Sequence, residues 1–389
     1  MDKKVRITFM LSSNMTQWAG GKKVVYEYVK FADKDHFDIQ VLQPLPYHNP
    51  TLSQEELKKM FNGVRITEFH YLVDYLASRL NSRLILNILM NPVLPFRKII
   101  FLITKLKNLR LLKKIESETD YFYLVNNDLA ELLSSHAKII GSEHIYLPGI
   151  YNGKPLESIS RKVILCLMKN GLAYRKIKAF HCINKPSLNH ISRYKKAFFV
   201  PNGMDSNIYY PSKRDHENIR LLFVGRIVSS KGIRELVEAF QSIKDTSLEL
   251  HVVGAGDLEH IFSNNNDDRI FYHGFLDEDD MAELYRQCDI FVFPSYYENF
   301  ALVIVEALSS GLYVITSEQI KPRFSDYEKE NYLEYVPINV SSIADAIKSI
   351  RTSHKILDYE EKEKLHERVK EEFDWRAIVK ELYKEITSV

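Results

Sequence analysis

The chain has 389 residues, of which 45% are hydrophobic and 12% aromatic, with a net charge of +2 and three cysteines. Its length favours two or three domains over one. The cysteines form no close pair and no histidine stands at metal-ligand spacing, which argues against a disulfide framework or structural zinc and for a cytoplasmic location. Asparagine, proline and basic residues interrupt the most apolar stretch, 84–106, so no transmembrane helix is expected.

Charge is divided unevenly along the chain. Residues 1–200 hold 31 Lys and Arg against 16 Asp and Glu, a net +15, whereas residues 201–389 hold 22 against 35, a net −13. This difference suggests separate roles for the halves, with an anionic partner or surface for the first. The alternative is that charge simply balances within one protein.

In the first half, short β-rich runs alternate with amphipathic helical stretches. Strands are predicted at 4–11, 37–43, 64–70, 121–125, 138–143, 179–184 and 196–202. Helices are predicted at 20–32, 97–115 and 162–177.

The second half shows the same alternation more regularly. Strands are predicted at 220–227, 248–255, 269–275, 289–295 and 312–318, and helices at 231–243, 277–288 and 299–311. Such alternation predicts right-handed βαβ units and a parallel sheet covered on both faces. The fold class is therefore α/β, with two facing doubly wound Rossmann-like domains and a cleft between them as the expected ligand site.

Domain boundaries are predicted where proline, glycine and asparagine residues interrupt the strand and helix pattern. Pro201, Asn202, Gly203 and Pro211 interrupt the pattern after a strand. The last segment is an isolated amphipathic helix after a charged run. We expect domains at 1–205 and 206–372, followed by a terminal helix at 373–389.

The stretch "FVGRIVSSKG" (223–232) places two cations after a strand. Gly225 allows a tight turn, and Arg226 and Lys231 stand five residues apart before a helix whose N-terminus also favours anions. Two such cations suit a diphosphate, because Arg can hold two phosphate oxygens and Lys acts as a mobile point charge. They could equally be surface cations on a loop.

Two glycine pairs also follow strands. Gly254 and Gly256 resemble half of a dinucleotide fingerprint, but the third glycine is missing, so close backbone approach is the simpler interpretation. Gly20 and Gly21 stand between the first strand and the first helix, where backbone N–H groups are open to an anion. An ordinary βα turn would explain them as well.

Glu298 and Glu306 bracket an almost entirely apolar run. In a helix, eight residues separate the α-carbons by about 12 Å, whereas hydrolytic carboxylate pairs work at roughly 5 to 10 Å. The pair therefore fits two contacts on one elongated, hydroxyl-rich ligand better than an acid and base on one bond. Glu298 could instead be a charge favoured by the helix dipole, and Glu306 a solvated helix residue.

Together these features resemble the retaining glycosyltransferases of the GT-B fold, in particular the large group 1 family, family 4. The resemblance rests on an ordered set that spans about a hundred residues of the carboxyl half: Gly225, Arg226, Lys231, Gly232, Gly254, Gly256, Pro294, Ser295, Glu298, Glu306 and Gly311. The amino half adds Gly20, Gly21, Glu143, His144 and residues 200–205.

The resemblance implies a role for each matching residue. Arg226 and Lys231 would bind the donor diphosphate, Glu306 the nucleotide ribose, and Glu298 the transferred sugar. His144 would face the donor sugar or the acceptor, although a satisfied core histidine is the alternative. The remaining donor contacts would come from the glycines, from residues beside the base and from backbone amides: Gly20, Gly21, Gly225, Gly254, Gly256, Phe275, Leu276, Asn299, Phe300 and Ala301.

The chain departs from the family at four places. The family often reads Glu-Gly-Phe-Gly where this chain has 298–301, which reduces backbone freedom beside the sugar. The usual proline after Gly311 is missing, Asn184 replaces a family serine, and a glycine pair after 314–318 is absent. These departures bear on the sugar pocket more than on the diphosphate site.

The resemblance implies a metal-independent hexosyltransferase without a cofactor, using a UDP- or GDP-sugar and a saccharide or lipid-linked acceptor. This activity would serve glycan or cell-surface polysaccharide synthesis. A non-catalytic nucleotide-sugar-binding protein and a nucleotide-sugar epimerase remain alternatives, while a phosphorylase lacks a motif for a lysine-held cofactor. The basic half contains no recognised nucleic-acid module, so no nucleic acid is expected as a partner.

Residues 96–114 combine seven Lys and Arg residues with a leucine and isoleucine face. This pattern is typical of an amphipathic helix that lies on a membrane surface, and it indicates peripheral contact with the inner face of a membrane through anionic lipid. A cationic helix packed on its own sheet is an equal alternative.

Overall fold

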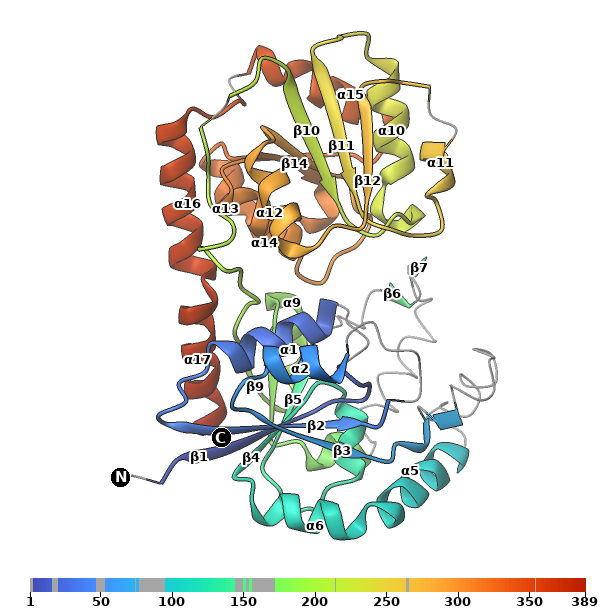
Figure 1. Cartoon of the computed structure of the whole chain (residues 1–389), viewed down its shortest axis with the longest axis vertical. Helices are drawn as coiled ribbons and strands as arrows, with labels where there is room; N and C mark the ends of the chain where they lie inside the picture. Colours follow the sequence, from blue (N-terminus) through green and yellow to red (C-terminus); the bar gives the residue numbers. More distant parts are fainter. Residues whose placement is uncertain are drawn as a thin grey trace. The chain divides into compact units, whose positions relative to one another are not determined.

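The computed structural model describes residues 3–15, 20–46, 53–73, 75–76, 95–143, 150–151, 154–155, 172–213, 215–263, 266–353 and 355–389. The chain divides into two compact units (Figure 1). The first unit comprises Met1–Pro201 and Ile378–Val389, and the second comprises Asn202–Ala377.

The first unit is built on a parallel sheet with the strand order β3-β2-β1-β4-β5-β8-β9. Its strands are β1 (Val5–Met10), β2 (Phe37–Pro44), β3 (Arg65–Phe69), β4 (Tyr121–Leu124), β5 (Ile139–Glu143), β8 (Ala179–Cys182) and β9 (Lys196–Phe199). All seven strands overlap strands predicted from the sequence. A short antiparallel pair, β6 (Ile150–Tyr151) and β7 (Lys154–Pro155), stands apart from this sheet.

Helices cover both faces of this sheet, with α1 on one side and α5 and α6 on the other (Figure 1). They are α1 (Gly20–Lys30), α2 (Gln54–Met60), α5 (Pro95–Lys107), α6 (Leu109–Ser117), α8 (Leu172–Lys176) and α9 (Lys185–Ile191). Central strands such as β4 are buried because both faces are covered, which explains their continuous apolar sequence. Part of the predicted helix 162–177 lies outside the described residues.

The second unit is also doubly wound. Its parallel strands have the order β12-β11-β10-β13-β14-β15. They are β10 (Ile219–Val224), β11 (Leu248–Val253), β12 (Ile270–Gly274), β13 (Ile290–Phe293), β14 (Tyr313–Ser317) and β15 (Leu333–Val336). The first five were predicted from the sequence, and β15 was missed.

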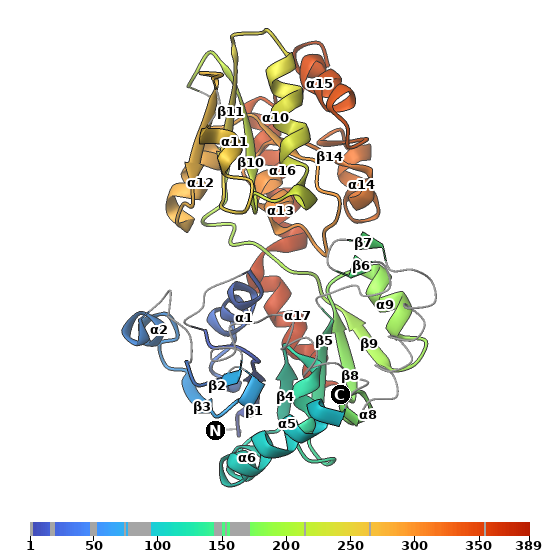
Figure 2. The same ribbon diagram turned by 90° about the vertical axis from the view of Figure 1, so that its right-hand side faces the viewer.

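Figure 2 shows α10 and α15 packed beside each other in this unit, and the two helices are in contact. The unit's helices are α10 (Ile233–Ser242), α11 (His260–Ser263), α12 (Glu278–Arg286), α13 (Leu302–Ser309), α14 (Lys321–Lys329), α15 (Val340–Lys348) and α16 (Tyr359–Phe373). Helix α13 is almost wholly buried, from Ile304 to Ser309, because α16 packs against it.

Helix α17 (Trp375–Thr387) begins in the second unit and continues into the first. Within the first unit, the Tyr383 hydroxyl donates to the Tyr28 carbonyl of α1 at 3.1 Å, and the Tyr383 ring lies 4.7 Å from that of Phe37. The terminal amphipathic helix predicted from the sequence is therefore present, and its apolar face packs on the first unit.

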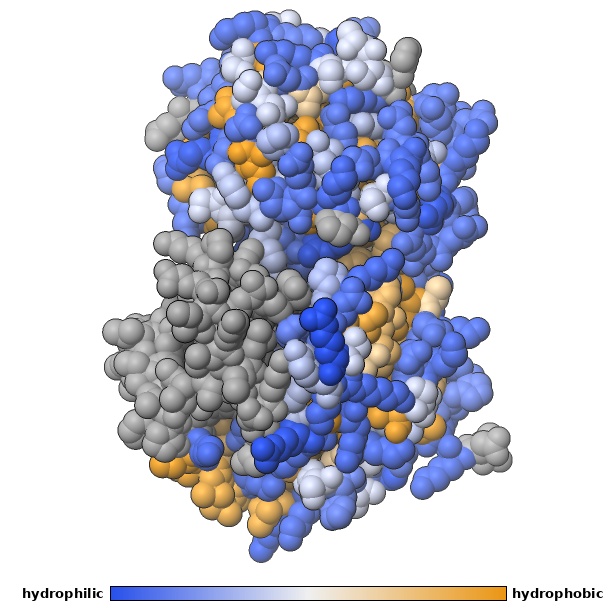
Figure 3. Space-filling view, turned by 180° about the vertical axis from the view of Figure 1, so that it is seen from behind, coloured by the Kyte–Doolittle hydropathy of each residue, from blue (hydrophilic) through white to orange (hydrophobic). Residues whose placement is uncertain are grey.

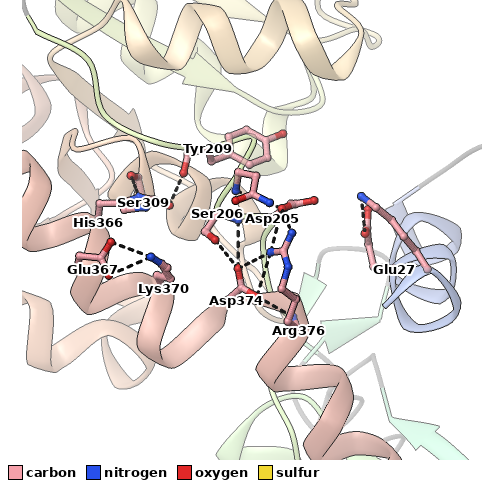
Figure 4. Close-up of polar contacts among 12 residues, drawn as sticks. Glu27, Asp205, Ser206, Tyr209, Ser309, His366, Glu367, Lys370, Asp374 and Arg376 are labelled. Atoms are coloured by element: carbon pink, nitrogen blue, oxygen red, sulfur yellow. Dashed lines mark hydrogen bonds and ion pairs between the residues drawn. The ribbon is translucent and has the colours of Figure 1, made fainter. Parts of the chain in front are cut away.

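A polar network joins the two segments through which the chain passes between the units (Figure 4). Ser206 Oγ donates to Asp374 Oδ2 at 2.5 Å, and the Arg376 guanidinium contacts both Asp374 at 3.0 Å and Asp205 at 3.2 Å. Backbone bonds between Met204 and residues 373–375 run beside these side chains. Both segments are thus fixed to each other inside the second unit.

The prediction of one continuous helix over 97–115 was wrong, because the structure has two helices that are interrupted at Asn108. The Asn108 amide donates to the carbonyls of His70 and Thr104, both at 2.7 Å, and its Oδ1 accepts from the His70 N–H at 3.0 Å. The side chain therefore holds the loop after β3, and the helix is interrupted where it does so.

Candidate functional site

The candidate site lies at the carboxyl edge of the second unit's sheet, where the order of the strands reverses. Strand β10 lies between β11, which follows it in sequence, and β13. Ligands of doubly wound sheets bind beyond the strand ends at such a switch point. The loop after β10 (225–232) carries the predicted residues Arg226 and Lys231, and the loop after β13 (294–301) carries Glu298.

Glycines allow the loops at this edge to approach one another closely. A Cβ on Gly232 would lie 2.1 Å from the Pro294 carbonyl oxygen, and one on Gly254 would lie 1.8 Å from that of Gly225. A Cβ on Gly256 would lie 2.4 Å from the Ile227 oxygen. Close backbone approach, the simpler of the two interpretations of Gly254 and Gly256, is therefore confirmed.

Lys231 and Glu298, which the sequence assigned to different parts of a ligand, form an ion pair with each other. Lys231 Nζ donates to Glu298 Oε1, and only 12% of the lysine side chain and 17% of the glutamate side chain are exposed. Ser295 Oγ lies 3.4 Å from the same oxygen and 3.3 Å from the Ser230 carbonyl. The two loops thus present a shielded charge pair at the switch point.

Arg226 differs from Lys231 in its surroundings. Its side chain is exposed, and among the described residues it has no hydrogen bond or ion pair. An exposed guanidinium of this kind is available to bind an anion without first breaking another contact.

Glu306 lies inside α13 and is 5% exposed. The Tyr285 hydroxyl donates to Glu306 Oε2 at 3.4 Å. Burial and the neighbouring Glu306 carboxylate hold the pKa of Tyr285 well above its usual value, so the phenol stays protonated and can serve as a donor. The carboxylate is consequently buried with a partner, as expected for an acidic residue among apolar neighbours.

Ala301, the residue before α13, has left-handed backbone angles (φ 63°, ψ 62°). The resemblance puts it where the family often has glycine, and the structure has there the conformation that glycine adopts easily. The preceding Phe300 is buried and its ring packs 5.9 Å from that of Phe373. The Tyr297 hydroxyl donates to Asn299 Oδ1, so side chains and strained backbone together fix this loop.

Substitution of Ala301 by valine is expected to lower the free energy of unfolding by about 2 to 3 kcal/mol, because a branched Cβ is poorly tolerated in the left-handed region. Ala301→Gly should change it by less than about 1 kcal/mol, since relief of strain is offset by greater freedom in the unfolded chain. Urea denaturation of both variants measures the difference. Equal stability of the two variants would show that the backbone at 301 is not left-handed.

Phe275 is the most exposed of the large hydrophobic side chains that the structure describes, at 80%. It follows β12 at the same sheet edge, with Leu276 next to it. Asp277 then caps α12 by accepting from the Asp280 N–H at 2.9 Å. An aromatic ring exposed to this extent is available for stacking on a planar ligand.

The candidate residues of the first unit are only partly described. Gly20 and Gly21 are the first two residues of α1 rather than a turn before it, so their N–H groups belong to the unsatisfied first helical turn. His144 lies outside the described residues. Its neighbour Glu143 ends β5, and burial raises the pKa of Glu143 to about 8.

Two polar residues near the predicted site, Tyr297 and Arg323, were missed, as was the contact made by a third, Ser295. Ser295 was noted only as a motif position, although its hydroxyl links both loops. Tyr297 and Arg323 carried no signal in the sequence, because neither has a characteristic spacing to another polar residue.

Two further findings concern all the residues that the structure describes. Within the ranges that the structure describes, no helix combines the length and apolarity needed to cross a membrane. In those ranges there is also no group of three or more His, Cys, Asp or Glu side chains placed to hold a metal ion.

The fold of the whole chain resembles that of solved two-domain structures. Sucrose-phosphate synthase from Thermosynechococcus elongatus aligns with 98% of this chain and 99% of its own at a TM-score of 0.70 and 18% identity. HepE of Anabaena, solved in complex with UDP and glucose, aligns with 99% of this chain and 100% of its own at a TM-score of 0.67 and 14% identity. The class defined by this fold is the GT-B architecture of two Rossmann-like domains.

The sequence of the second unit is similar to a known family. Residues 208–372 match the family described as "Glycosyl transferases group 1". A sulfoquinovosyl transferase of Arabidopsis thaliana is 29% identical over 196 residues, which are 45% of this chain and 36% of that protein. Residues 208–372 are thus similar in sequence to the group 1 glycosyltransferases. The chain's matches span less than half the length of the curated relatives.

Proposed function

We propose that the chain transfers a sugar from a nucleoside diphosphate sugar to a hydroxyl of a saccharide or lipid-linked acceptor, with retention of configuration, in the synthesis of a glycan or cell-surface polysaccharide. The observation that carries the proposal is the Lys231–Glu298 pair at the switch point of the group 1 domain. The structure of HepE in complex with UDP and glucose supports a nucleotide-sugar ligand for this fold.

Arg226 and Lys231 are proposed to bind the donor diphosphate. Arg226 is exposed, and Lys231 reaches the same edge from the end of a short 3₁₀ turn. As the bond to the sugar breaks, negative charge grows on the leaving diphosphate, and two cations fixed nearby stabilise it. Because the ion pair partner of Lys231 is Glu298, a bound diphosphate shares or displaces that contact.

Glu298 is proposed to accept hydrogen bonds from hydroxyls of the transferred sugar. Its partner Lys231 would lie on the diphosphate side of it, so one ion pair stands at the junction of sugar and phosphate. Glu306, 5% exposed inside α13, is proposed to bind the ribose. The separation of these carboxylates by a buried helical turn suits a ligand that extends along the sheet edge.

The other donor contacts are proposed from position alone. Phe275 and Leu276 would lie against the base, and the glycine-lined loops would let the phosphates approach the backbone. Amides of Asn299, Phe300 and Ala301 would contact the sugar or phosphate at the start of α13. Gly20, Gly21 and His144 would contribute from the first unit, which we assign to the acceptor.

The binding role of each domain is also part of the proposal. Residues 1–205 would bind the acceptor, residues 206–372 the nucleotide sugar, and residues 373–389 would form the terminal helix. The basic character of the first half, net +15, agrees with an anionic acceptor or surface.

No metal or cofactor is required by this mechanism. Arg226, Lys231 and the N-terminal amides of α13 supply the positive potential that a metal supplies elsewhere. The acceptor hydroxyl would attack from the face that the diphosphate leaves and pass its proton to a phosphate oxygen, which accounts for retention.

Nucleotide binding can be measured before any acceptor is known. UDP or GDP, and the matching nucleotide sugars, are expected to raise the melting temperature by the same amount with and without EDTA, because a ligand that binds only the folded state stabilises it. A panel of both nucleotide series in a thermal shift assay makes the measurement. Stabilisation that disappears with EDTA would contradict metal independence, and no stabilisation by any nucleotide would contradict the function.

Helices α5 and α6 are proposed to contact an anionic lipid surface. Figure 3 shows hydrophobic side chains gathered over these helices. They include Ile99, Leu102 and Leu106, which are 51%, 56% and 61% exposed. Exposed basic side chains surround them: Lys98, Lys107, Arg110, Lys113 and Lys114. Apolar anchors beside cations match the apolar interior and negative headgroups of an anionic membrane.

Flotation on vesicles with and without phosphatidylserine tests this surface. The protein is expected to float with anionic vesicles at low salt and to be released by salt or by Leu102→Glu with Leu106→Glu, since burying these side chains drives insertion. Tyr194→Glu, at a residue 50% exposed elsewhere in the first unit, serves as the control. Equal flotation of the double variant, or none by the wild type, would remove the proposal.

A further inference from the structure

Arg323 is a cation at the candidate site that the proposed mechanism does not use. It lies in the first turn of α14, beyond the carboxyl end of β14. Its Nε and Nη1 atoms are buried and have no hydrogen-bond partner among the described residues. Burial lowers the pKa of its guanidinium below the usual value. Two buried guanidinium nitrogens without hydrogen-bond partners cost free energy, so this arrangement needs a reason.

Two groups of the site already described act electrostatically on Arg323. Tyr297 and Glu298, from the loop after β13, act electrostatically on the guanidinium and raise its pKa against the effect of burial, as does Tyr335 of β15. Arg323 nevertheless forms no ion pair with Glu298, whose Oε1 is taken by Lys231. The guanidinium therefore feels the charge of Glu298, while its Nε and Nη1 atoms remain without a hydrogen-bond partner among the described residues.

The local backbone holds Arg323 in this position. Phe324, the next residue, has non-helical angles (φ −123°, ψ 21°) that kink α14 directly after Arg323, and its side chain is 1% exposed. The Tyr335 hydroxyl donates to the Lys321 carbonyl at 3.0 Å, which ties the first turn of α14 to β15. A guanidinium on an anchored turn is placed in advance of any ligand.

The order of the strands indicates which part of a ligand Arg323 meets. Strands β10, β13 and β14 are neighbours in that order. Their loops carry Arg226 with Lys231, then Glu298, then Arg323. If the first loop binds the diphosphate and Glu298 binds the sugar, the third position lies on the sugar side, away from the diphosphate.

We propose that Arg323 binds an acidic group on the transferred sugar, so that the preferred donor is a nucleoside diphosphate sugar with a carboxylate, such as a uronic acid. The fork of the guanidinium suits a carboxylate because two N–H groups can bind its two oxygens. This inference rests on the proposed function, and it assigns the class of sugar that the site selects.

Binding measured by calorimetry, without an acceptor, tests the inference. The probes are UDP, UDP-glucose and UDP-glucuronate, with GDP, GDP-mannose and GDP-mannuronate as the second series. In the series that binds, the wild type is expected to hold the acidic sugar about tenfold more tightly than the neutral one. Arg323→Gln should remove this preference and leave the affinity for the bare nucleotide unchanged.

Two further variants make the result specific. Arg323→Lys keeps the positive charge but loses the paired N–H groups of the guanidinium. It should therefore keep only part of the preference for the acidic sugar. Lys321→Gln removes a cation from the same turn whose partner is Glu328, at 2.9 Å, and it should keep the full preference.

The failures can be told apart. Equal binding of acidic and neutral sugars by the wild type, with the bare nucleotide still bound, would overturn the inference alone. A loss of affinity for the bare nucleotide in Arg323→Gln would assign the residue to the diphosphate instead and would overturn it too. Absence of binding by every nucleotide would contradict the proposed function itself.

Discussion

Replacing Lys231 with alanine is expected to lower kcat/KM for sugar transfer by about 10² to 10³-fold, because a cation fixed beside the leaving diphosphate stabilises charge that develops in the transition state. The variant should also bind the free nucleoside diphosphate more weakly. Release of the nucleotide during transfer measures the first effect, and calorimetry the second. Lys348→Ala, at an exposed residue of α15, is the matched control.

Because Glu298 is the ion-pair partner of Lys231, its substitution should affect diphosphate binding differently from that of Lys231. Glu298→Gln should lower kcat/KM by about 10²-fold, through the loss of a charged acceptor for sugar hydroxyls. It should bind the free diphosphate as well as the wild type does or better, because Lys231 no longer has a competing anion. Weaker diphosphate binding by Glu298→Gln, or near-normal transfer by both variants, would contradict the assigned roles.

Gly254→Ala is expected to lower the free energy of unfolding by about 4 kcal/mol, since overpacking and backbone strain add. The residue has φ 134°, and a Cβ there would lie 1.8 Å from a backbone oxygen that belongs to the loop after β10. Thermal and urea denaturation give the value.

Gly274→Ala separates these two causes. Gly274 has φ 66°, but nothing lies within 4 Å of an added Cβ. Alanine there should therefore cost only about 1 to 2 kcal/mol, the strain of the left-handed region. If the two variants were equally stable, the close approach of the loops after β10 and β11 would not contribute to folding.

The sheets could be predicted from the sequence because their strands are buried on both faces. The runs that became β10, β13 and β14 are almost continuously apolar, which marks covered parallel strands. Strand β15 was missed since it is four residues long and has two half-buried positions in its middle. Helix α16 was read only as a charged run, although Asp358 and Glu361 form a capping box at its start.

Motif spacing identified the site residues but could not predict how they contact one another. The motif spacing predicted that Lys231 and Glu298 lie at one sheet edge and contact different parts of a ligand. In the structure they form an ion pair with each other. Alanine in place of glycine at position 301 suggested reduced backbone freedom. Ala301 nevertheless has the left-handed backbone conformation that glycine adopts easily. Arg323 escaped notice because its significance lies in missing partners, which only coordinates reveal.

The anomeric configuration of the product tests the central proposal most directly. The purified chain would be given an α-linked nucleotide sugar and a panel of saccharide and lipid-linked acceptors, and the product followed by NMR. The proposal predicts an α-linked glycoside together with free nucleoside diphosphate. A β-linked product would contradict retention, an epimerised donor would indicate the epimerase alternative, and an intact donor that binds without reacting would indicate a binding protein.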